Sequence, residues 1–474
     1  MTSPLRGPSA AAFPVLAINI GAFALLQSLL VPVLPTIQRD LGTTPSVVTW
    51  TLTAWLLTAA VATPILGKVG DMIGKRRTIM ISLFAAALGS LIATLAPTIE
   101  LVIAGRVVQG LAAGIFPLTY GIIRDEFPAA KLPGMIGAVS AIIAIGSGLG
   151  TVLAGPIDAL FGWRALFWIP MLVFLGGAAA TRLVVPESEV RNGGTINWLA
   201  ATLMAGWLVA LLLPLSFGTQ WGWTSLTVIG LGLAAIVLFA SWVMVETRSS
   251  NPLIDMKLMR LTPIWTNNLA SLLFGAAMFG VFAFLPQLAQ MPATAGFGFG
   301  ASVTQSGFLI LPMTLAMAAA GFLSGRVSAM IGAKYQLVGS AAAVALASVA
   351  LALLHDSQIE IMLAGGLFGI GLGFGVAATA SLIVLTAPAG QIGVASGMNS
   401  NLRTIGGSIG AALMSALVTG NLQANGLPAE AGFTEGFLAM GGLAAIAILV
   451  ALLVPDHRPA AAPVAVAGLA SAKA

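Results

Sequence analysis

Charged side chains gather in one short stretch of this sequence, Gly67-Lys68-Val69-Gly70-Asp71-Met72-Ile73-Gly74-Lys75-Arg76-Arg77. Four of the 20 Lys and Arg residues and one acid fall there, although only 7% of the whole chain is charged. The chemistry open to such residues is ion pairing. Asp71 can face the positive N-terminus of a helix. The three basic residues that end the stretch can pair with acids on neighbouring loops, such as Asp125 or Glu126.

A further cation lies inside an apolar run of helix length. Arg106 shares one helix face with Gln109 and Gly110, which follow it at i+3 and i+4. A cation in apolar surroundings is expensive and marks a functional position by default. The alternative is a structural arginine whose donors are satisfied by backbone carbonyls. Arg403 is a second such cation, and for it the structural interpretation is favoured.

The side chains of common enzyme sites are missing. The sequence has no cysteine and only two histidines, His355 and His457, neither of which has a partner at metal-ligand spacing. It also has no phosphate loop of the Gly-x4-Gly-Lys-Ser/Thr type. We therefore expect no enzyme activity, no metal and no organic cofactor.

The elements that must position these residues are membrane helices. The chain has 474 residues, is 58% hydrophobic and has a mean hydropathy of +1.02. A soluble domain could not cover so much apolar surface with so few charges. Apolar runs of about 20 residues match a bilayer core, and continuous runs favour helices over a barrel. The net charge of +5 indicates basic loops on one membrane face, not a nucleic-acid partner.

Fourteen runs are long enough to span a bilayer. They lie near residues 13–37, 47–66, 78–97, 100–121, 134–157, 165–185, 197–216, 225–245, 264–288, 305–325, 336–355, 360–385, 392–419 and 434–454. With the N-terminus inside, only Arg39 and Arg164 fall outside, while Arg106 and Arg403 lie within spans. The other 16 of the 20 basic residues are then cytoplasmic, as the positive-inside rule requires. Both termini are expected in the cytoplasm. A plainer interpretation of residues 67–77 is therefore a topology signal.

The charged stretch has a fainter copy. Residues 325–334, Gly-Arg-Val-Ser-Ala-Met-Ile-Gly-Ala-Lys, repeat the pattern of residues 67–76 at an offset of 258. Three glycines recur at an offset of 260: Gly137, Gly146 and Gly150 match Gly397, Gly406 and Gly410. Both charged copies fall on the same side with eight predicted spans between them, which indicates a parallel repeat.

Two six-helix halves leave residues over, so two further helices are inserted between them. The predicted organisation is a cytoplasmic N-terminus (1–12), an N-terminal six-helix bundle (13–185), a linker with two extra helices (186–260), a C-terminal six-helix bundle (261–455) and a disordered cytoplasmic tail (456–474).

These features resemble the major facilitator superfamily, and the plan of six, two and six helices is similar to its fourteen-span drug/proton antiporter family. Residues 67–77 look like the family's loop between helices 2 and 3, and residues 106–110 look like its helix-4 motif. The resemblance implies the major facilitator fold: an all-α membrane protein of two six-helix bundles plus two inserted helices.

The resemblance also implies roles. The gating loop, which would latch the cytoplasmic gate, comprises Gly67, Asp71, Gly74, Lys75, Arg76 and Arg77. Because Ala329 stands at the position of Asp71 in the second copy, the latch should be asymmetric. Proton coupling, or the core of the first bundle, would involve Arg106, Gln109 and Gly110.

The fifth helix carries the spacing of the family's antiporter motif. Gly137, Gly146, Gly150 and Gly155 keep that spacing here, although Thr151 stands where the family usually has proline and Ala154 where it has glycine. The functional interpretation is a flexible seam between the halves that keeps the cavity from leaking. The predicted seam comprises Gly146, Gly150 and Gly155. The alternative is ordinary close packing through small residues.

The first helix departs from the family. An aspartate is usual about nine residues before a sequence like Pro35-Thr36-Ile37, where this chain reads Leu25-Leu26-Gln27-Ser28. No acid lies deep in a predicted span. A buried carboxylate with a raised pKa would be the natural proton carrier, so proton exchange is implied by resemblance alone. Asp158, near the outer end of the fifth helix, is either a substitute or a solvated acid.

A substrate cavity is expected between the halves near the midplane. Polar and aromatic residues of its helices are the candidates: Asn19, Gln27, Trp50, Trp55, Asn267, Asn268, Asn399 and Asn401. Amides without carboxylates favour neutral, anionic or weakly basic ligands. The alternative is hydrogen bonding between helices for the amides, and packing or a place in the interfacial belt for the tryptophans.

The expected function is secondary active export of amphipathic drugs or small molecules by alternating access, in exchange for protons, by a monomer in a bacterial inner membrane. The proton gradient replaces any cofactor, and the partners are the substrate and the bilayer. One alternative is an exporter of a single endogenous metabolite with atypical or no proton coupling. An alternative of another class is a membrane sensor that kept the fold and lost transport.

Overall fold

The protein is described here from a computed structural model that covers residues 11–128, 131–187, 195–388, 391–420, 422–423, 425 and 427–455. Within these residues, fourteen helices are long and apolar enough to cross a membrane, which confirms the predicted number. The predicted N-terminal segment before Ala11 and the predicted tail 456–474 lie outside the described residues.

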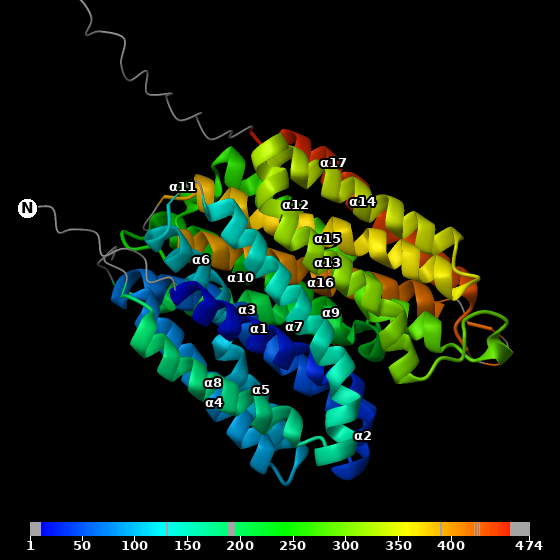
Figure 1. Ribbon diagram of the computed structural model, residues 1–474. Helices are drawn as coiled ribbons and strands as arrows, with labels where there is room; N and C mark the ends of the chain where they lie inside the picture. The colour runs from blue at the N-terminus through cyan, green and yellow to red at the C-terminus, as the bar shows by residue number, and fades with distance from the viewer. Residues whose placement is uncertain are drawn as a thin grey trace, which may run out of the picture.

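The spanning helices follow one another through short connections (Figure 1). They are α1 (Ala12–Leu29, continued by a 3-10 turn at Val31–Val33), α3 (Pro45–Ile73), α4 (Lys75–Leu95), α5 and α6 (Ile99–Gly110 and Ile115–Glu126, one span joined by a 3-10 turn), α7 (Leu132–Phe161), α8 (Ala165–Val184), α9 (Trp198–Trp221), α10 (Leu226–Arg248), α12 (Thr262–Gln290), α13 (Val303–Ile331), α14 (Ala333–Leu353), α15 (Gln358–Thr386), α16 (Ile392–Gly420) and α17 (Glu430–Leu453). Short helices α2 (Leu34–Asp40) and α11 (Met256–Met259) lie between spans.

The charged stretch is mostly helix, so its prediction as a loop is wrong. Helix α3 runs through Asp71 to Ile73, and α4 begins at Lys75, which leaves Gly74 alone as the turn. Gly74 has φ of +115°, and Gly332 of the fainter copy has φ of +86°. Glycine reaches this region without steric cost. The span predicted from hydropathy ends before the helix does, because the last two turns of α3 are polar but remain helical.

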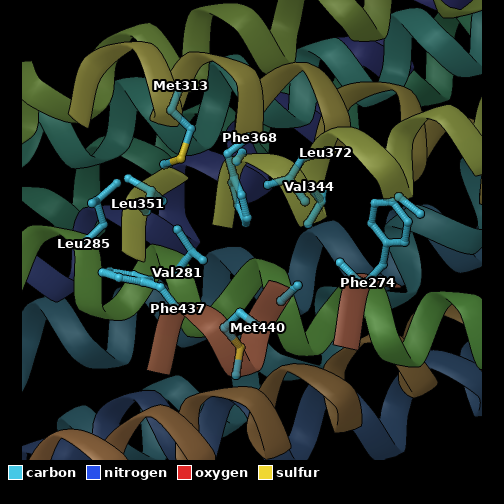
Figure 2. Packing of buried hydrophobic residues seen from close by; sticks show 14 of the residues in the cluster. Phe274, Val281, Leu285, Met313, Val344, Leu351, Phe368, Leu372, Phe437 and Met440 are labelled. Atoms are coloured by element: carbon cyan, nitrogen blue, oxygen red, sulfur yellow. The ribbon is translucent and has the colours of Figure 1, made fainter. Parts of the chain in front are cut away.

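The largest buried cluster lies almost wholly in the second half, and the next one joins the first half to residues of α15 and α16 such as Ile383 and Ile392. In Figure 1 the blue-to-teal helices α1 to α8 gather on one side and the yellow-to-red helices on the other, with α7 against α13 between them. Figure 2 shows the largest cluster, in which Val281, Met313, Phe368 and Phe437 come from four different helices and point toward one another. Lipid tails are as apolar as these side chains, so close packing, not water exclusion, holds the helices together.

The inserted helices lie against both halves. Helix α9 packs on α10, on α3 and on α16. Met204 and Trp207 of α9 share one buried cluster with Ala60 of α3 and with Val394 and Met398 of α16. Helix α9 therefore covers the line where α3 meets α16, and α10 packs on α9.

Candidate functional site

A cavity of about 330 Å³ lies between the two halves. The first half lines it with Phe23, Gln27, Trp55, Phe116 and Thr151, among others, and the second half with Phe279, Phe282, Thr314, Arg403 and Thr404, among others. This volume lies within the range of small-molecule sites, which are typically apolar with a few polar groups. The cavity thus occupies the place where the repeat predicts a substrate site.

The cavity is closed toward the end of the molecule that carries residues 67–77 and 325–334, here called the basic end. Lining residues Val31 and Pro286 lie at the other end of their helices. Arg403 lies eleven residues after the start of α16, which is about 16 Å from the basic end at 1.5 Å per residue. Arg403 therefore belongs to the floor of the cavity.

Two helix contacts close the basic end. The first seam joins α3 to α16, where a Cβ added at Gly67 would lie 2.5 Å from the carbonyl oxygen of Gly393. The second seam joins α7 to α13, where a Cβ added at Gly137 would lie 2.5 Å from the carbonyl oxygen of Gly321. The seams are related by the internal repeat, and at both of them backbone meets backbone.

Asp71 lies at the first seam. Its side chain is 2% exposed and faces the first turn of α16, where a Cβ added at Gly393 would lie 3.0 Å from Asp71 Oδ2. A carboxylate is favourable at a helix N-terminus. The predicted position of Asp71, against the N-terminus of a helix, is therefore confirmed as geometry, and that helix belongs to the opposite half. The corresponding Ala329 is exposed.

The basic residues after Asp71 pair within the first half. Lys75 Nζ lies 2.7 Å from Asp125 Oδ2 and 3.6 Å from Asp71 Oδ1, which confirms the predicted partner Asp125. Arg76 and Arg77 lie 3.6 and 3.7 Å from Glu187 Oε2. Asp125 ends α6 and Glu187 follows α8, so these pairs do not cross between the halves. The expectation that they latch the halves together is wrong for this state.

One arginine does reach across. Arg124 Nη1 donates to the carbonyl oxygen of Ala387 at 3.2 Å, which joins the end of α6 to the segment after α15. The contacts across the basic end thus include one carboxylate and one guanidinium, and each meets backbone of the other half.

Arg106 lies in the core of the first half, not in the cavity wall. It is fully buried, and its Nε donates to Thr51 O at 3.0 Å while Nη1 donates to Gln109 Oε1 at 2.8 Å. Gln109 Nε2 in turn donates to Ser90 Oγ. Gly110 lets α5 approach α3, since a Cβ there would lie 2.9 Å from Trp55 O. Trp55 stands between Arg106 and the cavity, with the guanidinium carbon 5.3 Å from its ring centroid.

The structure places only two of the eight candidate binding residues, Gln27 and Trp55, in the cavity wall. Asn19 donates to Thr181 Oγ1, and Asn267 donates to Thr379 O. Asn399 donates to Asn268 Oδ1 and to Ser271 Oγ.

The remaining two candidates also lie away from the wall. Trp50 stacks on Phe217 of α9 with ring centroids 4.8 Å apart, and Asn401 is buried in α16. Hydrogen bonding between helices therefore accounts for Asn19, Asn267, Asn268 and Asn399, and packing accounts for Trp50.

The helix-5 glycines face a different neighbour from the one expected. A Cβ added at Gly146 would lie 2.5 Å from Gly21 O, and one at Gly150 would lie 2.6 Å from Leu25 O. Both face α1 of the same half, and nothing lies within 4 Å of a Cβ at Gly155. The glycines of α7 that meet α13 are Gly134, Gly137 and Gly148. The seam assignment to Gly146, Gly150 and Gly155 is therefore wrong, because those glycines point away from the second half.

Two acids, Glu187 and Glu246, and the place of Arg403 in the cavity were not predicted from the sequence. Arg403 lines the cavity although the structural interpretation was favoured for it. Glu187 is the partner of Arg76 and Arg77. Glu246, 2% exposed near the end of α10, accepts hydrogen bonds from the backbone N–H groups of Leu253 and Ile254. A buried acid just before an Asn-Pro-Leu-Ile turn was the available signal for this last contact.

Comparison with known proteins decides the family. A sequence profile described as Major Facilitator Superfamily matches residues 16–196, 188–411 and 291–472. The chain belongs to the Major Facilitator Superfamily. Members of this superfamily are transporters and not enzymes, so the chain is a multi-pass membrane transporter.

Bacterial relatives in the superfamily are named for drug resistance, and one of them also for export. The chain is 28% identical over 417 residues to the tetracenomycin C resistance and export protein of Streptomyces glaucescens, covering 86% of this chain and 76% of that protein. It is 30% identical over 386 residues to a multidrug resistance protein B homolog of Mycobacterium tuberculosis, covering 79% of this chain and 70% of that protein. The crystal structure of the human organic anion transporter MFSD10 has the same fold, with a TM-score of 0.71 over 94% of this chain and all of that one at 16% identity.

Proposed function

We propose that this superfamily member exports amphipathic small molecules across a bacterial inner membrane by alternating access. The observation that carries the proposal is an apolar, aromatic cavity that both halves line and that two glycine seams close at the basic end. Relatives named for multidrug resistance and for tetracenomycin C resistance and export support the direction and the substrate class.

The orientation is part of the proposal. The positive-inside rule places the basic end in the cytoplasm, so the cavity described here would belong to an outward-facing state. Both chain termini would then be cytoplasmic, and the transporter would work as a monomer. In this state Asp71 and Arg124 hold the cytoplasmic gate closed.

The energy source has two candidates. Family resemblance implies exchange for protons. Among the described residues, however, no carboxylate lines the cavity, and Asp158 lies near the far end of α7 outside it. This observation favours export without a proton-carrying carboxylate in the substrate site.

An assay with purified protein in liposomes tests both transport and its coupling to protons. An imposed pH gradient is combined with a panel of anionic, neutral and cationic aromatic amphiphiles, and substrate flux and lumenal pH are recorded together. Flux of any probe that exceeds that of empty liposomes supports transport, and lumenal pH that moves with the substrate supports proton exchange. Flux without a pH change supports the second candidate. No flux of any probe would favour the sensor with the same fold.

A further inference from the structure

The cavity contains a cation without a counterion. Among the described residues that line it, Arg403 is the only charged one. Within the described residues no carboxylate oxygen lies within 4 Å of its guanidinium, and one donor, Nη2, bonds to Ser400 Oγ at 3.2 Å. A guanidinium has five N–H donors in a planar fork, and within the described residues the bond to Ser400 uses one of them, while Tyr120 lies beside the same side chain.

The surroundings of Arg403 favour an acidic group over other ligands. Arg106 brings a second positive charge behind Trp55, also without an acid partner among the described residues. Two cations and no carboxylate give the cavity a positive field, which repels a cationic ligand and attracts an anionic one. A planar carboxylate can accept two parallel hydrogen bonds from one guanidinium.

The walls specify the body of the ligand. The ring centroid of Phe23 lies 5.8 Å from that of Trp55 and 5.4 Å from that of Phe116, where the contact is edge-on, so three aromatic rings form one cluster in the wall of the first half. Phe279 and Phe282 line the second half. Aromatic side chains on both walls favour a ligand with an aromatic body, and Gln27 and Thr314 supply polar groups beside it.

We propose that Arg403 makes this cavity a site for aromatic organic anions, with a carboxylate or similar acidic group on the guanidinium and the rings between the aromatic walls. The inference rests on the proposed transport function and narrows its substrate class. It also gives Arg403 a binding role in place of a structural one.

Three probes with one scaffold test the proposal: anthracene-2-carboxylate, anthracene-2-carboxamide and anthracen-2-ylmethylammonium. Binding to purified protein and flux into proteoliposomes are measured for the native chain, Arg403→Gln and Arg403→Lys. The native chain should bind the carboxylate about tenfold to a hundredfold more tightly than the carboxamide, as expected for charge-assisted hydrogen bonds. Arg403→Gln should abolish that preference and leave carboxamide binding within about twofold. Arg403→Lys should keep part of the preference, since it retains the charge and loses the fork.

The controls separate the possible failures. Arg260→Gln removes an exposed arginine far from the cavity and should leave the preference unchanged. Unchanged carboxamide binding shows that Arg403→Gln is folded. The anion site is overturned if the native chain binds carboxylate and carboxamide equally well, or if Arg403→Gln keeps the preference for the carboxylate. In either case, flux of the carboxamide would still support the proposed transport function. If none of the three probes binds or is transported, both the anion site and the proposed transport function are overturned.

Discussion

The two seams that close the basic end are related by the internal repeat but differ in chemistry. At the first seam Gly67 meets Gly393, the Asp71 carboxylate faces the start of α16, and α9 covers the contact. At the second seam Gly137 meets Gly321, and the position equivalent to Asp71 is the exposed Ala329. Duplication has kept the backbone contact at both seams, while charge is found at only one.

This difference separates what the fold needs from what the gate needs. Close approach of two helices requires a missing Cβ on each side, and both seams satisfy that requirement with glycine. A switch requires a contact whose energy can change without repacking of a core, and a single carboxylate at a helix end satisfies it. The first seam therefore should govern opening, and the second should act as a passive partner.

The largest effect is expected at Lys75, which corresponds to Ala333 in the second copy. Lys75 is fully buried between Asp71 and Asp125, and Lys75→Met leaves two buried carboxylates without their cation. Breaking a buried pair in this way costs about 3–5 kcal/mol in soluble proteins. We expect a clear drop in the thermal midpoint followed by tryptophan fluorescence. Lys257→Met, at an exposed site, is the matched control, and an equal midpoint for the two variants would contradict the role of Lys75.

The second-largest effect is expected when a bulky residue replaces Gly67. Gly67→Val places atoms against the backbone of α16, which cannot move aside, and overpacking costs about 1–3 kcal/mol. The closed-to-open ratio should fall by about fivefold to a hundredfold. Distances between labels on α3 and α16 at the basic end would report the opening, together with reduced flux. Gly155→Val, where no atom lies within 4 Å of the new Cβ, should change neither distance nor flux.

Neutralising Asp71 should affect the stability of the protein little but should clearly reduce transport. Asp71→Asn keeps the shape and removes the charge that faces α16, worth about 1–2 kcal/mol in a partly buried setting. We expect about fivefold to thirtyfold less flux with normal expression, because Lys75 keeps Asp125 as its partner. Asp356→Asn, exposed at the opposite end, should transport normally. Unimpaired flux in Asp71→Asn would show that the charge has no part in gating.

The smallest effect is expected when the second copy is given the missing charge. Ala329→Asp adds a carboxylate at an exposed position, where solvent and salt screen it, so the change should stay below about 0.5 kcal/mol. Flux should remain within about twofold of the native value. A strong gain or loss would mean that the two seams respond to charge alike, and the proposed asymmetry would fail.

The sequence predicted the elements well and the facing of side chains poorly. Fourteen spans and the place of Asp71 followed from hydropathy, spacing and family resemblance. Helices α3 and α13 extend beyond their predicted ends because polar turns at a membrane surface remain helical. Glu187 could not be anticipated as a partner of Arg76, since 111 positions separate the two residues.

Cavity membership was the hardest property to predict. Asn399 and Arg403 lie one turn apart on α16, yet Asn399 bonds to Asn268 where the bundle is closed, while Arg403 reaches the cavity floor. A difference in depth of about 6 Å along one helix thus separates a packing residue from a binding residue. The spacing of residues in the sequence predicts which face of a helix they share. Only the packed structure shows at which position along the helix the two halves separate to form the cavity.

The missing carboxylate of the cavity has a consequence for energetics. An organic anion carried outward from a cell that is negative inside is driven by the membrane potential, and 100 mV supplies about 2.3 kcal/mol per charge. At about 1.4 kcal/mol per factor of ten, that sustains roughly a fiftyfold gradient. A site built around Arg403 would let the membrane voltage itself drive export. The departure from the family pattern at Leu26 and Gln27 would then remove a group that such a cycle does not use.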